Sequence, residues 1–307
     1  MFAGANTRRC DSLEEPLVQT LERPETEERA PASENIVPGK ISLVLPAHNE
    51  EPNIRTVVEE AAEVLPTAFS DYEVIVVNDG SKDRTLEIAE DLTRENPHVR
   101  VVNHPVNRGY GAALTSGFNA ATGDYIMFMD SDRQFDINDI HRLTPHVPDY
   151  DIVAGYRIKR NDPAHRLLNA AIFGMAVRLM FDIKVRDIDC AFKVMHADVL
   201  KGINLESPGA LINTEILAKA KVQGCTLTQV GVYHYARQAG EQSGANLKVV
   251  LRAFREIIRL WWRMRTYSPP SGEVVEPPPT WRGFALFGSA AAVGLLFLRG
   301  LLRLFKK

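Results

Sequence analysis

Two aspartates one residue apart, Asp130 and Asp132, directly follow the apolar run 125–129. Neighbouring carboxylates can bind a hard cation such as Mg²⁺ or Mn²⁺, and these ions readily bridge diphosphate oxygens. A cation held there would offset the charge that develops on a departing nucleoside diphosphate. Aspartate and serine also favour solvated turns, so the pair alone leaves both interpretations open.

Polar clusters also follow two other apolar runs, at 46–51 and 78–83, and this favours a binding site over an isolated turn. In the second cluster, Asp79 could accept hydrogen bonds from a base N–H or a ribose hydroxyl. It could instead cap the next helix. Gly109 lies in the glycine-containing segment 107–111, ahead of a helical pattern, where it would allow either close approach of a nucleotide phosphate or tight packing of the helix start.

The elements that must position these residues are strands alternating with helices. Predominantly apolar runs of strand length occur at 41–45, 73–77, 99–103, 125–129 and 151–154. Helical patterns lie between them at 53–65, 83–95, 110–121 and 138–144. This alternation predicts an α/β fold with a mostly parallel sheet, whose ligands bind at the carboxyl ends of the strands.

The rest of the chain is less regular. Helices are expected over 165–181 and 213–222, with a short strand at 226–230. The predicted organisation is a disordered tail over 1–38, a catalytic domain over 39–245, an amphipathic helix over 246–265, a proline-rich linker over 266–280 and a hydrophobic membrane anchor over 281–307.

Composition narrows the class of partner. The net charge of -3 argues against nucleic acid, because binding to a phosphate backbone needs a positive surface. The three cysteines show no metal-ligand spacing, so we interpret them as free thiols in a reducing compartment. The N-terminus carries no apolar core of a secretory signal.

Six segments together resemble the family 2 glycosyltransferases, which have the GT-A fold, and within them the dolichyl- or polyprenyl-phosphate mannosyl- and glucosyltransferases. The resemblance covers roughly residues 40–265. It rests on segments 46–51, 78–83, 107–112, 130–134, 187–193 and 237–243. The sequence departs from the family pattern at Asn78, His48 and Ala191, none of which disturbs the acidic pair.

The resemblance implies roles for the matching positions. Pro46, Ala47, Glu50 and Asp79 would surround the nucleotide of a nucleotide-sugar donor. Asp130, Asp132 and Gln134 would hold the metal, Mg²⁺ or Mn²⁺. Arg157, Arg166, Arg237 and Ser243 would hold the acceptor phosphate of a polyprenyl or dolichyl lipid. The catalytic set would be Asp130, Asp132, Asp187, Asp189 and Arg237.

A lipid phosphate is largely ionised near neutral pH and needs no strong base, which predicts direct displacement of the donor's diphosphate with inversion. Arginine suits this acceptor because its planar fork matches phosphate oxygens. If the acceptor were a glycolipid or saccharide hydroxyl instead, Asp187 or Asp189 would have to act as base. A structural turn with ion pairs to Arg186 or Lys193 is the other interpretation of these two aspartates. A non-catalytic membrane scaffold of the same fold is the third functional hypothesis.

Contact with membrane lipids is expected from the C-terminal region. Basic residues recur every three or four positions at Lys248, Arg252, Arg255, Arg259 and Arg263. Apolar residues fill the other side at Val250, Leu251, Phe254, Ile257, Ile258, Trp261 and Trp262. Such a helix suits a bilayer interface, although packing on the domain is the alternative. The uncharged run 283–298 is flanked by arginines, and its length is short for a helix that spans the bilayer. Because nucleotide-sugars are found in the cytoplasm, we expect the catalytic domain on the cytoplasmic face.

Overall fold

The computed structural model describes residues 36–158, 164–201, 203–236 and 247–269. For 164–170 and 247–254 only the backbone is described. Several predicted features therefore lie outside the described residues: most of the N-terminal tail, the segment with Arg237 and Ser243, most of the linker and the hydrophobic run near the C-terminus.

A seven-stranded sheet forms the centre of the domain, in the order β3-β2-β1-β4-β6-β5-β7. The strands are β1 (Val37–Ala47), β2 (Phe69–Asp79), β3 (Val99–His104), β4 (Tyr125–Phe128), β5 (Ile152–Arg157), β6 (Lys193–His196) and β7 (Leu227–Val232). Strand β6 runs antiparallel to both neighbours, β4 and β5, and the other strand pairs are parallel. The predicted mostly parallel α/β sheet is confirmed.

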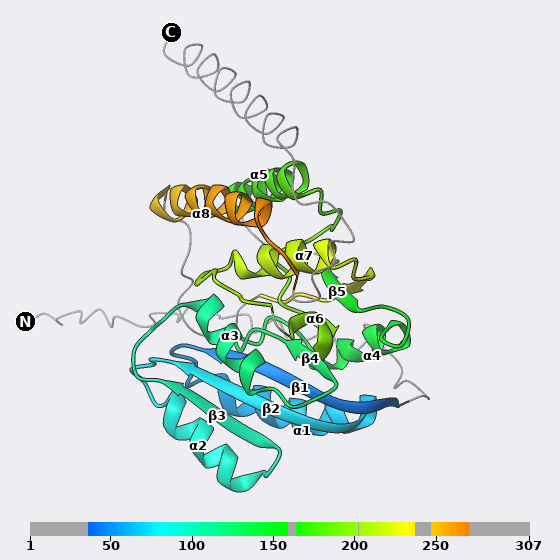
Figure 1. Cartoon of the computed structure of the whole chain (residues 1–307). Coiled ribbons are helices and arrows are strands. Elements are labelled where there is room, and N and C mark those ends of the chain that lie inside the picture. Colours follow the sequence, from blue (N-terminus) through cyan, green and yellow to red (C-terminus); the bar gives the residue numbers. More distant parts are fainter. Residues whose placement is uncertain (1–35, 159–163, 202, 237–246, 270–307) are drawn as a thin grey trace, which may run out of the picture.

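Helices cover both faces of this sheet, which is why its strands are apolar on both sides. The longer helices are α1 (Ile54–Ala68), α2 (Thr85–Glu95), α3 (Tyr110–Ala120), α5 (Ala164–Phe181), α7 (Ile212–Val222) and α8 (Leu247–Arg265). Short helical turns fill 137–146, including α4 (Ile140–Leu143), and α6 (Ala197–Leu200) follows β6. Figure 1 shows α1 and α2 beneath the sheet and α3 on its opposite face.

Strand β6 was missed by sequence analysis, because four residues of mixed polarity carry no strand signal. The other strands were found, but two begin earlier than their apolar runs. Strand β1 starts at Val37, inside the predicted tail, and β2 starts at Phe69. Their first residues, Val37 and Phe69, are buried and pair with each other, but the residues directly after them are partly or fully exposed, so no apolar run marks these strand starts.

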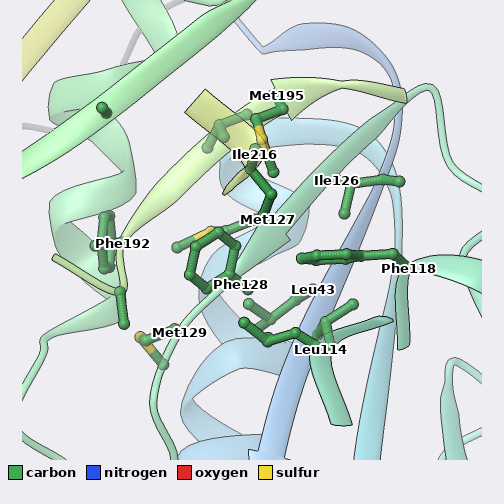
Figure 2. Close-up of a cluster of buried hydrophobic side chains, with 14 of the residues drawn as sticks. Leu43, Leu114, Phe118, Ile126, Met127, Phe128, Met129, Phe192, Met195 and Ile216 are labelled. Carbon is green, nitrogen blue, oxygen red and sulfur yellow. The ribbon is translucent and has the colours of Figure 1, made fainter. Parts of the chain in front are cut away.

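Helix α3 and strand β4 meet in an apolar cluster that fixes the end of β4. Phe118 of α3 contacts Phe128 of β4 edge to face, with ring centroids 5.8 Å apart. Figure 2 shows Leu114 and Leu43 beside this pair, and Phe192 and Met129 to one side. Rigid packing here holds the chain immediately before Asp130.

Helix α8 packs on the domain through part of its apolar face. Ile257, Leu260, Trp261 and Met264 are fully buried. Trp262 and Ile258 point outward instead, with 52% and 36% of their surfaces exposed. The helix predicted to lie in a membrane interface is therefore docked on the protein along one side and exposed along another.

Helices α5 and α8 lie side by side at the end of the molecule away from β2 and β3 (Figure 1). Within the described residues, no helix combines the length and apolarity needed to cross a bilayer.

Candidate active site

The carboxyl ends of the parallel strands meet at one edge of the sheet, and the antiparallel β6 brings its first residue to the same edge. In the strand register Phe128 pairs with Lys193, which in turn pairs with Ala154. The segment after β4, the end of β5 and the segment before β6 are thus neighbours. Asp130, Arg157 and Asp187 come together here although they are far apart in sequence.

Asp130 and Asp132 form an acidic pair just past β4, as predicted. Burial and the charge of Asp132 raise the pKa of Asp130 to about 7, against opposing effects of Tyr110, Arg157 and Lys193. The Tyr110 hydroxyl bonds to the Asp130 carboxylate. Crowded carboxylates of this kind suit a divalent cation, which would offset their repulsion.

The donor set is sufficient for Mg²⁺ or Mn²⁺ only together with substrate. Among the described residues no group of three or more His, Cys, Asp or Glu side chains could hold a metal. Protein-bound Mg²⁺ commonly uses one or two carboxylates and completes its shell with water and substrate phosphates. The pair therefore fits a cation that binds with a diphosphate.

Gln134, the third predicted metal ligand, also has a structural role. Its side-chain amide donates to the Tyr235 carbonyl (3.1 Å), and its own carbonyl accepts from the Tyr235 amide (2.8 Å). Its backbone N–H donates to the Asp132 carboxylate (3.1 Å). The amide nitrogen is committed to Tyr235, so the amide oxygen is the atom that could ligate a cation.

The loops after β1 and β2 are joined by hydrogen bonds, and several residues of the two predicted nucleotide motifs make these bonds. The Glu50 amide donates to the Thr85 hydroxyl (2.9 Å), and the Glu51 amide donates to Asp83 (3.1 Å). The Pro46 carbonyl accepts from the Ser131 hydroxyl (2.8 Å), which ties the first loop to the acidic pair. Ala47 and Glu50 are buried. The motifs thus build the loop framework, and their contact with a nucleotide stays a prediction.

Asp79 is buried and bonds to the loop before α3. Its Oδ1 accepts from the Arg108 amide (2.8 Å) and pairs with His104 Nδ1 (2.8 Å), and its Oδ2 accepts from the Gly109 amide (2.8 Å). Both oxygens are therefore engaged with the chain. The residue does not cap helix α2, which is one of the two roles we considered; Asp83 bonds to the amide of Thr85 at that helix start.

The glycines of segment 107–111 serve close packing. A β-carbon on Gly109 would lie 2.6 Å from the Pro208 carbonyl oxygen, and one on Gly111 would lie 2.0 Å from the Ser207 carbonyl oxygen. Gly109 has φ 98°, a conformation that favours glycine. Of the two roles considered for Gly109, the structure supports packing of the helix start, which sets the position of Tyr110.

The loop that receives these glycines is held by Glu215, a residue that sequence analysis missed. The fully buried Glu215 carboxylate accepts from the Glu206 and Ser207 amides (3.2 and 2.8 Å) and pairs with Lys219 (2.8 Å). Hydrogen bonds keep its pKa low despite the opposing effect of burial. A Glu and a Lys four residues apart in a helix suggest an ion pair, but the sequence does not reveal its burial.

Arg157 and Asp187 form a two-bond ion pair, with Nε–Oδ2 2.6 Å and Nη2–Oδ1 2.8 Å. The pair with Asp187 outweighs the effect of burial and raises the pKa of Arg157. Of the two ion-pair partners that we considered for the aspartates, Arg186 lies over the Tyr156 ring at 4.2 Å, and Lys193 interacts electrostatically with Asp187. An acceptor phosphate at Arg157 would share the guanidinium with this carboxylate.

Lys193 supports the turn that carries Asp187 and Asp189. Its ammonium donates to the Ile188 carbonyl (3.1 Å) and to the Cys190 carbonyl. Sequence analysis had placed Lys193 only as a potential ion-pair partner of the aspartates. The backbone of Arg166 lies in α5, its side chain is outside the described part, and Arg237 and Ser243 are outside it altogether.

Comparisons with known proteins identify several glycosyltransferases as relatives of this chain. The 29%-identical glycosyltransferase AglD of Haloferax volcanii matches over 77% of this chain and 39% of its own length. The dolichyl-phosphate beta-glucosyltransferase ALG5A of Trichomonas vaginalis is 27% identical over 68% of each chain. The undecaprenyl-phosphate 4-deoxy-4-formamido-L-arabinose transferase of Pseudomonas fluorescens is 27% identical over 70% of this chain and 62% of its own. The chain thus spans less than two thirds of two of these relatives.

A solved structure shares the fold. Glucosyl-3-phosphoglycerate synthase from Mycobacterium tuberculosis, in complex with Mn²⁺, UDP and glucosyl-3-phosphoglycerate, superposes with a TM-score of 0.56 at 20% identity, covering 80% of this chain and 86% of that one. The sequence profile of glycosyl transferase family 2 matches residues 42–203, more than half of the chain. With the acidic pair at the end of β4 and this match together, the chain belongs to glycosyl transferase family 2 and is a glycosyltransferase.

Proposed function

We propose that this protein transfers a hexose from a nucleotide-diphospho-sugar to a polyprenyl or dolichyl phosphate, with inversion, for synthesis of cell-envelope glycans or glycoconjugates. The donor is of the GDP-mannose or UDP-glucose type. Two relatives named as dolichyl-phosphate and undecaprenyl-phosphate transferases support this acceptor class. Processive polysaccharide synthases carry a Gln-x-x-Arg-Trp pattern, which this sequence does not contain. This favours transfer of a single sugar.

The observation that carries the proposal is the Arg157–Asp187 pair beside the acidic pair. A carboxylate held by two guanidinium bonds is stabilised as an anion and is a poor proton acceptor. This disfavours Asp187 as the base that a hydroxyl acceptor would need. An ionised lipid phosphate needs no such base, and its attack on the anomeric carbon would expel the nucleoside diphosphate.

Each group of residues in the active site has its own proposed role. Asp130 and Asp132, together with the Gln134 amide oxygen, would hold Mg²⁺ or Mn²⁺, which supplies charge stabilisation to the diphosphate when bound. Tyr110 orients Asp130 through its hydroxyl. Arg157 would bind the acceptor phosphate, and Asp187 fixes the direction of its guanidinium.

Exposed side chains on α5 and α8 support contact with a membrane, and the use of a nucleotide-sugar favours its cytoplasmic face. Ile172 and Met175 of α5 are 40% and 51% exposed, and Ile258 and Trp262 of α8 are also exposed. Arg255 is exposed on α8 as well. Exposed apolar side chains with neighbouring arginines suit a bilayer surface with anionic lipids.

A transfer assay tests the proposal. Purified protein in detergent receives radiolabelled GDP-mannose or UDP-glucose, polyprenyl phosphate and Mn²⁺ or Mg²⁺, with Asp132→Ala as control. Label that enters the organic phase only with metal, and at least about 100-fold less in the control, supports the proposal. Transfer to a glycolipid hydroxyl but not to the lipid phosphate would overturn the acceptor class. Failure of both donors to bind would favour the scaffold hypothesis.

A further inference from the structure

Lys193 is a buried cation whose presence needs an explanation. Only 1% of the residue is exposed, and it lies between Phe128 and Ala154 in the strand register. Removing an ammonium from water costs several kcal/mol unless it is compensated, and an apolar side chain of similar length would avoid that cost.

The ammonium is compensated by three acceptors from two segments. Its donors reach the carbonyls of Ile188 (3.1 Å) and Cys190, and the side-chain oxygen of Asn213 (3.3 Å) at the start of α7. This matches the three N–H groups of a lysine. The ammonium also lies 5.4 Å from the centre of the Phe128 ring, a favourable cation–π distance. Lys193 therefore joins the turn 187–190 to α7 and β4.

The same ammonium lies close enough to the acidic groups of the active site to interact with them. Phe128, its strand partner, is two residues before Asp130. The positive charge interacts electrostatically with Asp130, Asp187 and Asp189. A nucleoside diphosphate would add further negative charge here, so a fixed cation behind the carboxylates reduces the repulsion it meets.

We propose that Lys193 is a positioning residue for sugar transfer: a buried ammonium, held by three acceptors, that fixes the Asp187–Cys190 turn and offsets part of the negative charge at the diphosphate site. The inference rests on the proposed function, because the diphosphate and the divalent cation belong to that reaction. A merely structural lysine would hold the turn without changing how ions bind at Asp130 and Asp132.

The test compares Lys193→Met, which removes the charge, with Lys193→Arg, which keeps it. Mn²⁺ binding is measured by electron paramagnetic resonance at pH 8.5 without substrate, and binding of GDP and UDP is measured by calorimetry without metal. In Lys193→Met we expect Mn²⁺ affinity to rise about tenfold, because the carboxylates lose a neighbouring cation, and nucleoside diphosphate affinity to fall by a similar factor. Lys193→Arg should restore both toward the wild-type values.

Asn213→Asp keeps the proposal testable if Lys193→Met does not fold. This substitution preserves the shape and the acceptor oxygen while it neutralises the ammonium with an adjacent anion. It should also raise Mn²⁺ affinity and lower diphosphate affinity. Unchanged affinities in the folded variants would overturn the role of Lys193, as would equal weakening of both ligands in Lys193→Met and Lys193→Arg.

The two proposals fail in different ways. If the wild-type protein binds neither Mn²⁺ nor a nucleoside diphosphate, the proposed reaction is wrong, and the inference falls with it. If the wild type binds both ligands, and Lys193→Met and Asn213→Asp bind them with the same affinities as the wild type, only the role of Lys193 is wrong.

Discussion

Tyr110 connects helix α3 to the acidic pair through a single hydroxyl group. The hydroxyl bonds to Asp130, and burial together with the charge of Asp130 raises the pKa of Tyr110, so the group stays a donor. A hydrogen bond to a charged partner contributes about 1.5–3 kcal/mol. Its loss should therefore be measurable without removing a metal ligand.

Tyr110→Phe should lower Mn²⁺ affinity and the rate of sugar transfer by about tenfold, since Asp130 loses the donor that orients it. Metal titration and initial rates would check this. Tyr72→Phe is a matched control, because the Tyr72 hydroxyl, away from the acidic pair, accepts a long bond from Asn96 (3.4 Å). Equal effects in both variants would contradict a specific role for Tyr110.

Asp139 links the pH of the solution to the stability of the domain. Burial raises its pKa from 3.8 to about 6, although Tyr233 and Arg142 oppose the shift through bonds of 2.6 and 2.9 Å. The folded state thus binds the proton more tightly than the unfolded state. The cost of ionising Asp139 is absent below about pH 4 and fully present above pH 6, so stability falls as pH rises between them.

Asp139→Asn should remove this contribution. Relative to the variant, the wild type should lose about 2 kcal/mol in free energy of unfolding between pH 4 and pH 6, out of about 3 kcal/mol over the whole titration. Urea unfolding across this range measures the difference, with the exposed Asp149→Asn as control. Parallel pH profiles for wild type and Asp139→Asn would contradict the assignment.

At the scale of elements, the start of α3 depends on contact with the loop 206–209. The Gly111 amide donates to the Pro208 carbonyl (2.8 Å), and Glu215 holds the same loop from the other side. This contact sets where Tyr110 meets Asp130. Packing distant from the acidic pair therefore decides its geometry.

Gly111→Ala should destabilise the protein by roughly 2–3 kcal/mol, because the added methyl group overlaps the Ser207 carbonyl. Gly174→Ala in α5 is the matched control: a β-carbon there meets nothing within 4 Å, and alanine favours the helix by up to about 1 kcal/mol. Thermal unfolding should show a lower midpoint for the first variant and an equal or higher one for the second. The reverse order would contradict the packing argument.

The sequence predicted the strands and helices that have an apolar pattern of their own. It missed the features that depend on contacts between residues distant in sequence. Apolar runs located β1 to β5, and the residues after β4 located the acidic pair. Strand β6 was missed because its pairing with β4 and β5 provides the stability that its composition does not. The pairing of Asp79 with His104 and of Asp187 with Arg157 was missed for a related reason: these partners end strands β3 and β5, 25 and 30 residues away in sequence, and the sheet brings them close.

At the scale of the whole molecule, helix α8 places two adjacent tryptophans in different environments. Trp261 is fully buried against the domain, whereas 52% of Trp262 is exposed. On the buried side the helix is also held by Arg263, which bonds to Glu206 (2.5 Å). The exposed side is the one that would meet lipid in the proposed membrane association.

Trp262→Ala should weaken binding to vesicles that contain phosphatidylserine and lower stability by only about 1 kcal/mol, because its ring also meets Trp261 edge to face. Trp261→Ala should instead destabilise the fold by about 3–5 kcal/mol, because it leaves a cavity in the core. Vesicle sedimentation and thermal unfolding would separate the two effects. If Trp262→Ala binds vesicles as wild type does, the exposed face of α8 is not the lipid contact.

The antiparallel β6 also governs how the chain folds during its synthesis. Strands β1 to β4 can pair as soon as Phe128 has left the ribosome, but the free edge of β4 stays open until Lys193–His196 has been made. Strand β5 emerges earlier and does not cover that edge, because its partners among the described strands are β6 and β7. An unpaired edge strand is prone to aggregation. A nascent chain stopped before residue 193 should therefore bind chaperones, and one extended past β7 should release them.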